Sequence, residues 1–309
     1  MIMSDVQEGD HPTAQACDKF AELVKKRTNG KVVIEVYHGS TLGTEAEQIA
    51  QATVGGIDFV RVSSPVAAYY DDIKAFQALY LYSSEDDMWK VLDGEIGNEF
   101  LKAQQLKDNG LEGLCWISGG SRNFYNNVRP ITSPEDLAGL TLRVNTDSMF
   151  AFLESCGAKG INVSYNDIYN SIEAGTIDGA ENNWPSYIST GHYKVAPYIT
   201  VDEHTRIPEM IVASTESMNK LTSEQQQIVR ECAQEAGQLQ RKWMQEYDEK
   251  AIKMAFNLFS GDTPSINNYG DSINQVKECK SYTVKDLFCS SYAPYFWQAI
   301  QIRYPEYTK

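Results

Sequence analysis

One arginine within a short apolar run has the chemistry to capture a small carboxylate. Arg143 stands between Leu142 and Val144. In a strand, alternate side chains point to opposite faces, so Arg143 points away from the pair that packs the core. Its planar guanidinium can donate two parallel hydrogen bonds to a carboxylate, which lysine cannot copy. The same spacing also suits an ordinary strand arginine that reaches solvent, and both interpretations stay open on spacing alone.

Other polar and aromatic side chains could complete such a site. Arg122 follows a Gly-Gly-Ser turn and carries the same two interpretations as Arg143. Residues 177–187 read Ile-Asp-Gly-Ala-Glu-Asn-Asn-Trp-Pro-Ser-Tyr, which places amides, carboxylates and an indole after a glycine turn. Trp184 and Tyr165 suit either a hydrophobic core or an exposed aromatic face that stacks on a sugar ring.

The motifs of the common catalysts do not occur in the chain. None of the four histidines accompanies a GxSxG nucleophile motif. Asp178 and Glu181 are close in sequence, but among 42 acidic residues such pairs arise by chance. There is no P-loop, no GxGxxG after a strand and no HExxH, and the six cysteines form no CxxC pair. The sequence therefore favours a binding protein over an enzyme, with no metal and no cofactor.

Charge and composition narrow the class of partner. The chain has 309 residues, 42% of them hydrophobic, and a formal net charge of −15. It is long enough for one large domain or two ordinary ones. The negative charge argues against nucleic acid and anionic membrane surfaces, so an anionic ligand needs a local basic pocket. Residues 1–5 lack the features of a signal peptide, so we expect either a cytoplasmic protein or one whose signal peptide has been removed.

Strands and helices alternate along the chain, which predicts an α/β fold. We expect helices at 14–27 and 45–54, and a helix that starts at Asn166-Asp167 and ends at Gly175. Ser133-Pro134-Glu135-Asp136 has the features of a helix start. The β-branched runs 32–37 and 57–62 predict buried strands, as do 114–117, 142–144 and 207–213. No low-complexity linker separates these units, so we infer two α/β lobes whose chain crosses between them more than once.

A single long helix is predicted near the end of this pattern. Thr222 and Gln225 suit a helix cap, and an apolar stripe then continues to Ala255 without a proline. Some 35 residues at 1.5 Å each span roughly 50 Å. That length exceeds the width of one lobe, so the helix could brace two lobes or lie on the surface of a single domain.

Several motifs in order resemble the extracytoplasmic substrate-binding proteins of TRAP transporters (tripartite ATP-independent periplasmic transporters). The likeness covers roughly residues 5 to 257. The segments that carry it are Thr28-Asn29-Gly30-Lys31, Thr41-Leu42-Gly43, Gly120-Ser121-Arg122, Ser133-Pro134-Glu135-Asp136-Leu137-Ala138-Gly139, Leu142-Arg143-Val144 and Ile177-Asp178-Gly179-Ala180-Glu181-Asn182. The resemblance implies a two-lobed periplasmic binding protein fold of a type II-like kind, with crossing strands, a lobe-spanning helix and the ligand in the interlobe cleft.

The resemblance also implies roles for particular residues. Arg143 would pair with the ligand carboxylate and Arg122 would assist it. Asn182 would add a polar contact, Tyr165 would pack on the ligand, and Ser63 would reach it from the other lobe. The expected partners are a small carboxylate ligand and the small and large membrane subunits of the transporter, and the expected location is the periplasm.

One part of the motif set looks like the members that bind hexuronates such as D-glucuronate and D-galacturonate. These residues are Glu181-Asn182-Asn183-Trp184-Pro185-Ser186-Tyr187 and Asp202-Glu203-His204-Thr205-Arg206. Arg143 would take the acid and Trp184 could offer a stacking face. The hydroxyls could be divided among Asn182, Asn183, Glu45, Asp10 and His11, with Arg61 as an additional contact. The alternatives are a receptor for a C4-dicarboxylate or another organic acid, an ABC-type or sensor-associated binding protein, and an enzyme that acts on sugar acids.

The likeness also suggests how the chain divides into lobes. Lobe I is expected to comprise residues 1–119 plus 207–247, and lobe II residues 120–206 plus 248–309. Ligand binding would close the lobes about a hinge. The stretch after Phe256 departs from the family pattern, and Cys279 and Cys289 within it could form a disulfide bond.

Overall fold

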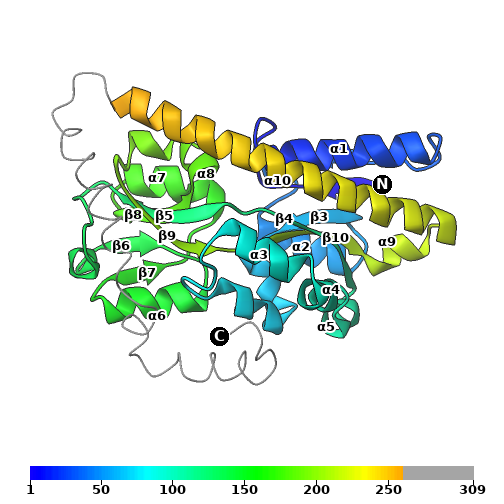
Figure 1. Cartoon of the computed structure of the whole chain (residues 1–309), viewed down its shortest axis with the longest axis horizontal. Coiled ribbons are helices and arrows are strands. Elements are labelled where there is room, and N and C mark those ends of the chain that lie inside the picture. Colours follow the sequence, from blue (N-terminus) through cyan, green and yellow to red (C-terminus); the bar gives the residue numbers. More distant parts are fainter. Residues whose placement is uncertain (260–309) are drawn as a thin grey trace.

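Two five-stranded sheets form the framework of the protein. The computed structural model describes residues 1–259 (Figure 1). We call the half built on the first sheet lobe I and the half built on the second lobe II. The sheet of lobe I has the order β2-β1-β3-β10-β4, with β1 (Ile2–Ser4), β2 (Glu35–Tyr37), β3 (Phe59–Val62), β4 (Leu111–Ile117) and β10 (Glu209–Ser214). The sheet of lobe II has the order β7-β6-β8-β5-β9, with β5 (Ser121–Asn126), β6 (Thr141–Arg143), β7 (Lys159–Ile161), β8 (Gly179–Asn183) and β9 (Tyr198–Arg206).

Both sheets are built to the same plan. In lobe I, β1 pairs in parallel with β2 and β3, and β10 runs antiparallel between β3 and β4. In lobe II, β6 pairs in parallel with β7 and β8, and β5 runs antiparallel between β8 and β9. In open α/β sheets of this kind, ligands bind in the crevice outside the carboxyl ends of the parallel strands.

Helices cover the two sheets on both sides (Figure 1). Lobe I carries α1 (Pro12–Arg27), α2 (Glu45–Thr53), α3 (Glu85–Leu92), α4 (Glu95–Leu101), α5 (Gln104–Asp108), α9 (Thr215–Asn219) and the 3₁₀ helices η1 (Ser64–Ala68) and η2 (Asp71–Gln77). Lobe II carries α6 (Asp147–Ser155), α7 (Ile168–Glu173), α8 (Trp184–Ser189) and the 3₁₀ helices η3 (Pro134–Leu137), η4 (Tyr165–Asp167) and η5 (His192–Lys194). The expected helix start at Ser133 therefore gives only a single 3₁₀ turn, and the strand expected over 32–37 is regular only over 35–37.

The chain passes between the lobes through two short connections. Residues 118–120 join β4 to β5, and residues 207–208 join β9 back to β10. Gly120 adopts a φ of +67°, and a Cβ there would lie 3.0 Å from the Cβ of Asn183. A side chain larger than hydrogen at this position is therefore both strained and crowded. The chain therefore crosses between the lobes more than once, as the alternating pattern predicts.

The long helix α10 (Ser223–Phe259) extends along both lobes (Figure 1). It packs on α1 and β4 of lobe I and on α8 of lobe II. Its first turn has the expected cap, because Gln225 N donates to Thr222 Oγ1 at 3.3 Å and Thr222 N donates to Gln225 Oε1 at 3.0 Å. The 37 residues span about 55 Å. The helix therefore braces both lobes, and the alternative, a helix on the surface of a single domain, is wrong.

One buried glutamine fastens this helix to the first crossing connection. Gln240 Oε1 accepts a hydrogen bond from Ser118 N at 2.7 Å, and Gln240 Nε2 donates to Ser118 O at 2.9 Å. The same amide nitrogen lies 3.2 Å from Thr13 Oγ1 on α1. Gln240 thus fastens the first residue of the crossing connection to α10 and α1.

The cysteines in the described part of the chain are not joined by disulfide bonds. Cys17, Cys115, Cys156 and Cys232 are free thiols, whereas Cys279 and Cys289 lie outside the described residues. Within residues 1–259, every helix is too short or too polar to cross a membrane.

Candidate ligand-binding site

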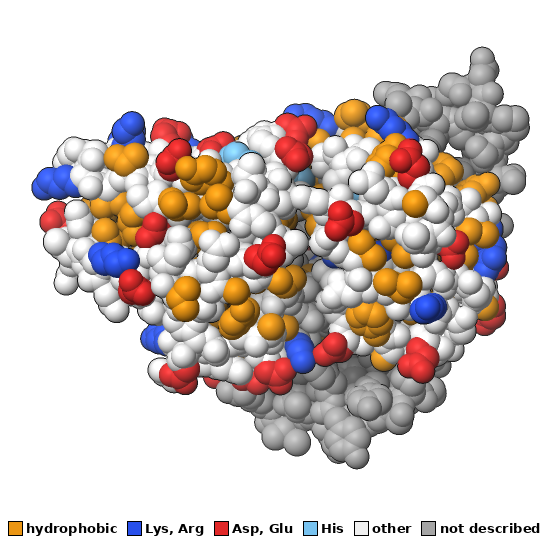
Figure 2. Space-filling view, turned by 180° about the vertical axis from the view of Figure 1, so that it is seen from behind, with side chains coloured by type: hydrophobic (Ala, Val, Ile, Leu, Met, Phe, Trp, Pro, Cys, Tyr) orange, Lys and Arg blue, Asp and Glu red, His pale blue; other side chains and the backbone are white. Residues whose placement is uncertain are grey.

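Buried polar side chains from the two lobes face each other where the parallel strands end. The groove between the lobes is visible on the surface in Figure 2. Lobe II contributes residues of β5, β6 and β8. Lobe I contributes residues at the ends of β1 and β3, the start of α2 and the start of β10. This is the position at which such sheets bind ligands.

Arg143, at the end of β6, has spare hydrogen-bonding capacity. Leu142 and Val144 pack in the core of lobe II, so Arg143 points to the opposite face as expected. Its side chain is 6% exposed, and its Nε donates to Val163 O at 2.9 Å. Within the described residues no acceptor is found for its two Nη groups. Burial lowers the pKa of Arg143, Glu181 raises it and Arg122 lowers it. This guanidinium therefore lacks a close anion.

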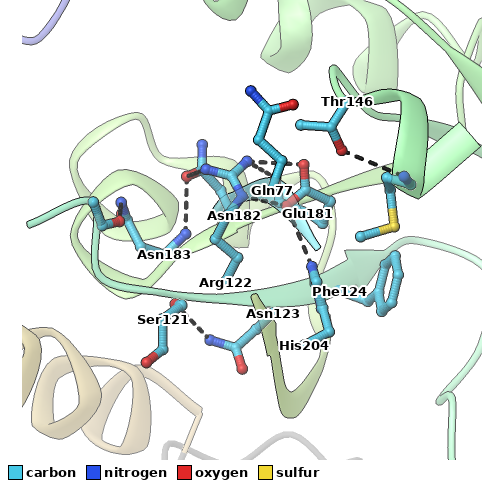
Figure 3. Close-up of polar contacts among 12 residues, drawn as sticks. Gln77, Ser121, Arg122, Asn123, Phe124, Thr146, Glu181, Asn182, Asn183 and His204 are labelled. Carbon is cyan, nitrogen blue, oxygen red and sulfur yellow. Dashed lines mark hydrogen bonds and ion pairs between the residues drawn. The ribbon is translucent and has the colours of Figure 1, made fainter. Parts of the chain in front are cut away.

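Arg122, by contrast, forms its hydrogen bonds with residues of its own lobe (Figure 3). Its guanidinium forms a two-pronged pair with Glu181 of the neighbouring strand β8, with Nε donating to Oε2 and Nη2 donating to Oε1 at 2.8 Å. Nη2 also donates to Glu181 O at 2.9 Å, and Nη1 donates to Asn182 Oδ1 at 3.0 Å. These bonds leave Arg122 little capacity for direct contact with a ligand. It orients Glu181 and Asn182 instead.

A buried histidine extends this network. His204 Nδ1 lies 2.9 Å from Asp202 Oδ2, and His204 Nε2 lies 3.4 Å from Glu181 Oε2. The ring stacks on Phe124 at 4.4 Å between centroids. Burial favours the neutral ring, but Asp202 and Glu181 raise its pKa to about 9. Burial raises the pKa of Glu181, but Arg122 and His204 lower it to about 2. At neutral pH this cluster therefore holds charged groups of both signs.

The stability of the fold should depend on the protonation of His204. Its pKa is about 9 in the folded protein against an ordinary 6.5, so the folded state binds this proton more tightly. The contribution, roughly 3 kcal/mol, is complete below pH 6.5 and is lost as the pH rises to about 9. Urea unfolding across this range should show the decline in the wild type. In D202N the decline should be smaller and end at lower pH, because Asp202 helps to raise the folded-state pKa, and an equal decline in H204Q would contradict the assignment.

The two asparagines that follow Glu181 have different roles. Asn182 Oδ1 accepts from Arg122 and, at 2.9 Å, from Asn183 N, while its amide nitrogen finds no acceptor within residues 1–259. Asn183 Oδ1 caps α8 by accepting from Ser186 N at 2.7 Å, and Asn183 Nδ2 donates to Gly119 O at 2.6 Å. Asn182 therefore retains a donor for a ligand. Asn183 joins the crossing connection to lobe II, and both polar atoms of its side-chain amide form hydrogen bonds within the protein.

The two expected aromatic contacts also differ. Trp184 is only 8% exposed and packs edge-on against Tyr187 at 6.0 Å, in the core beneath α8. Its side chain is therefore part of the hydrophobic core. This was the alternative to an exposed face that stacks on a sugar ring. Tyr165 reaches across the cleft, where its hydroxyl donates to Gln7 Oε1 of lobe I at 3.0 Å.

Lobe I presents a buried arginine surrounded by carboxylates. Arg61 Nε donates to Asp5 Oδ1 at 3.0 Å. Arg61 Nη1 lies 3.3 Å from Glu209 Oε1 and 3.7 Å from Glu45 Oε2. Arg61 Nη2 and Asp5 Oδ2 are buried without a hydrogen-bond partner in the described part of the chain. Such unpaired buried polar atoms are costly unless a ligand or water satisfies them.

Three more residues of lobe I are predicted ligand contacts, namely Ser63, His11 and Asp10. Ser63 Oγ donates to Glu45 at 2.9 Å, so it orients that carboxylate. His11 caps α1, with its Nδ1 accepting from Thr13 N at 3.2 Å, and burial together with Arg61 lowers its pKa to about 3. The neutral ring therefore carries its proton on Nε2, which is buried and unpaired among residues 1–259. Asp10, which precedes His11 in the chain, is exposed.

Side chains at the rim hold the lobes together in this structure. Ser148 Oγ at the start of α6 donates to Gln77 O at 2.7 Å, and Lys74 pairs with Asp147 at 3.1 Å. Gln77, which Figure 3 draws together with the Arg122 cluster, donates from its Nε2 to Ser64 O of its own lobe at 3.3 Å. With the Tyr165 bond, the Ser148 and Lys74 contacts describe a closed arrangement of the lobes.

Several site residues carry no motif in the sequence. Asp5 and Glu209 complete the carboxylate set around Arg61, while Gln7 and Gln77 bridge the cleft. Asp5 follows a strand of only three residues, and Glu209 follows Pro208 at the start of β10. A polar residue at a strand end is the one signal that could have marked them. Within the described residues, no group of three or more His, Cys, Asp and Glu side chains could hold a metal ion.

Two lobes on crossing strands, a bracing helix and a charged cleft define a periplasmic-type solute-binding protein. The chain belongs to the bacterial extracellular solute-binding proteins of family 7, whose model matches residues 3–261. This is a family of solute receptors rather than enzymes. A second model, for a family of unknown function, matches residues 218–309.

Relatives and solved structures agree with this membership. A solute-binding protein of Chromohalobacter salexigens is 34% identical over 244 residues, which are 78% of this chain and 72% of the relative. A TRAP solute-binding protein of Sulfitobacter with bound β-D-galacturonate aligns at TM-score 0.81 and 28% identity, covering 99% of this chain and 96% of that one. One from C. salexigens with bound D-glucuronate aligns at TM-score 0.82 and 28% identity, covering 97% and 99%. The expected two-lobed fold is thereby confirmed.

Proposed function

We propose that the chain is the extracytoplasmic receptor of a TRAP transporter and binds a hexuronate, such as D-glucuronate or D-galacturonate, between its lobes. The observation that carries this proposal is the different chemistry of the two faces. On lobe II, Arg143 offers two unpaired Nη groups that suit a carboxylate. On lobe I, Arg61 Nη2 and His11 Nε2 are unpaired donors and Asp5 Oδ2 is an unpaired acceptor.

A sugar acid matches this arrangement group by group. Its carboxylate takes the guanidinium of Arg143, and Asn182 adds its free amide donor. Its hydroxyls both donate and accept, so they can satisfy donors and acceptor alike on lobe I. The solved neighbours with bound galacturonate and glucuronate support the same ligand class.

Ligand binding is coupled to closure in this proposal. Lobe I comprises residues 1–119 plus 207–247, and lobe II residues 120–206 plus 248–309, of which 260–309 lie outside the described part. A ligand that contacts both lobes favours the closed form by its differential affinity. The rim contacts of Tyr165 and Ser148 add to the closed state. The closed receptor then delivers its ligand, in the periplasm, to the membrane subunits of the transporter.

A thermal-shift screen over uronates, aldonates and dicarboxylates tests this function. A ligand at a hundred times its dissociation constant stabilises the folded protein by about 2.7 kcal/mol, so a tight uronate raises the melting temperature clearly. Galacturonate or glucuronate should give the largest shift, and calorimetry should then give a one-site affinity. Stabilisation by a C4-dicarboxylate alone, or turnover of the uronate on incubation, would contradict the proposal.

A further inference from the structure

The two faces of the cleft differ in charge. Lobe I places three carboxylates, those of Asp5, Glu45 and Glu209, around the single guanidinium of Arg61. All four side chains are largely buried, so water screens their charges weakly. Lobe II presents the unpaired guanidinium of Arg143.

Carboxylates crowd one another on the lobe I face. Burial raises the pKa of Glu209, Arg61 lowers it, and Glu45 and Asp5 raise it, with a result of about 7. Arg61 therefore does not neutralise its three neighbours. A further negative charge placed here would meet the same repulsion.

The two clusters influence each other across the cleft without touching. Glu209 raises the pKa of Arg122, and Glu45 raises that of Arg143. Among the described residues, however, no hydrogen bond or ion pair joins these acids to these arginines. A ligand atom between them therefore meets positive potential on its lobe II side and negative potential on its lobe I side.

We propose that the acidic face of lobe I, formed by Asp5, Glu45 and Glu209, excludes ligands that carry a second carboxylate. The inference rests on the proposed function and specifies its substrate class as sugar acids with one carboxylate. Hexarates, in which both ends of the carbon chain are oxidised to acids, are rejected. The specificity arises from like-charge repulsion rather than from shape.

Arg61 does not provide a second carboxylate site. Its unpaired Nη2 can donate to a neutral hydroxyl without adding charge. A carboxylate at the same place would add a negative charge beside this group of three acids. One guanidinium already shared among three acids has little attraction left for it.

Competition between galacturonate and galactarate tests the inference. The wild type should bind galacturonate more tightly than galactarate by on the order of 100-fold, because two like charges about 5 Å apart repel strongly near a protein interior. In E209Q, and independently in E45Q, this ratio should fall by about 10-fold. Glutamine resembles the protonated Glu209 side chain, so the fold should persist, and E95Q, at an exposed glutamate of lobe I, is the matched control.

The outcomes separate this inference from the function on which it rests. A lower ratio in E209Q and E45Q, but not in E95Q, supports the acidic filter. If wild type binds galacturonate while both variants keep the wild-type ratio, the filter is wrong and the receptor function stands. If wild type binds no uronate at all, the proposed function fails and the inference fails with it.

Discussion

Replacing Arg143 with alanine should abolish measurable uronate binding. Arg143 supplies two unpaired Nη donors at the buried end of β6, whereas Arg122 is already bonded to Glu181 and Asn182. No other arginine of lobe II described here can take its place at the ligand carboxylate. Truncating one partner of a buried, hydrogen-bonded charge pair costs about 4 kcal/mol, which is roughly a thousandfold in affinity.

Isothermal titration calorimetry with galacturonate measures this loss. R143K retains the charge but not the fork of donors, so its affinity should fall between those of wild type and R143A. K159A removes an exposed charge from the neighbouring strand β7 and should bind as wild type does. Because burial lowers the pKa of Arg143 in the free protein, R143A should fold normally without ligand. Wild-type affinity in a folded R143A would disprove the site.

The second large effect concerns stability rather than binding. Replacing Glu181 with glutamine leaves Arg122 and His204 without the carboxylate that lies between them. Removing one partner of a buried ion pair typically costs about 3–5 kcal/mol. His204 can release its proton in response, so we expect the lower part of that range. Chemical denaturation at neutral pH should show the loss as a lower midpoint.

A matched variant separates this loss of stability from a general effect of removing a carboxylate from lobe II. E173Q changes an exposed glutamate at the end of α7 in the same lobe and should unfold as wild type does. Equal midpoints in E181Q and wild type would show that the Arg122–Glu181 pair contributes no net stability.

Local patterns were sufficient to predict much of the framework. The apolar periodicity of 223–255 and the β-branched strand at 59–62 are properties of short segments, so they can be read in sequence. Strands β5 and β9 were not predicted, because their sequences are rich in polar residues. They read Ser-Arg-Asn-Phe-Tyr-Asn and Tyr-Ile-Thr-Val-Asp-Glu-His-Thr-Arg. Their polar positions are buried in the network of lobe II, so they lack the apolar signal of a core strand.

The site was harder to predict than the fold, for a physical reason. The position of Arg143 follows from strand alternation. The acidic face of lobe I, however, joins residues 5, 45 and 209, which only the folded topology brings to Arg61. Whether a polar group is free for a ligand also depends on its partners. Asn183 and Arg122 have the right chemistry, but their hydrogen bonds are made within the protein.

The bond between Gln240 and Ser118 restricts how the receptor can move. An α-helix does not stretch, and α10 is fixed to the first residue of the crossing connection, next to lobe I, while its far end lies on lobe II. Sliding of lobe II along lobe I would have to disturb either these bonds or the packing of α10 on α8, whereas rotation within residues 119–120 would leave the bonds to Ser118 in place. We therefore expect the lobes to close by rotation about the crossing connections rather than by sliding past one another.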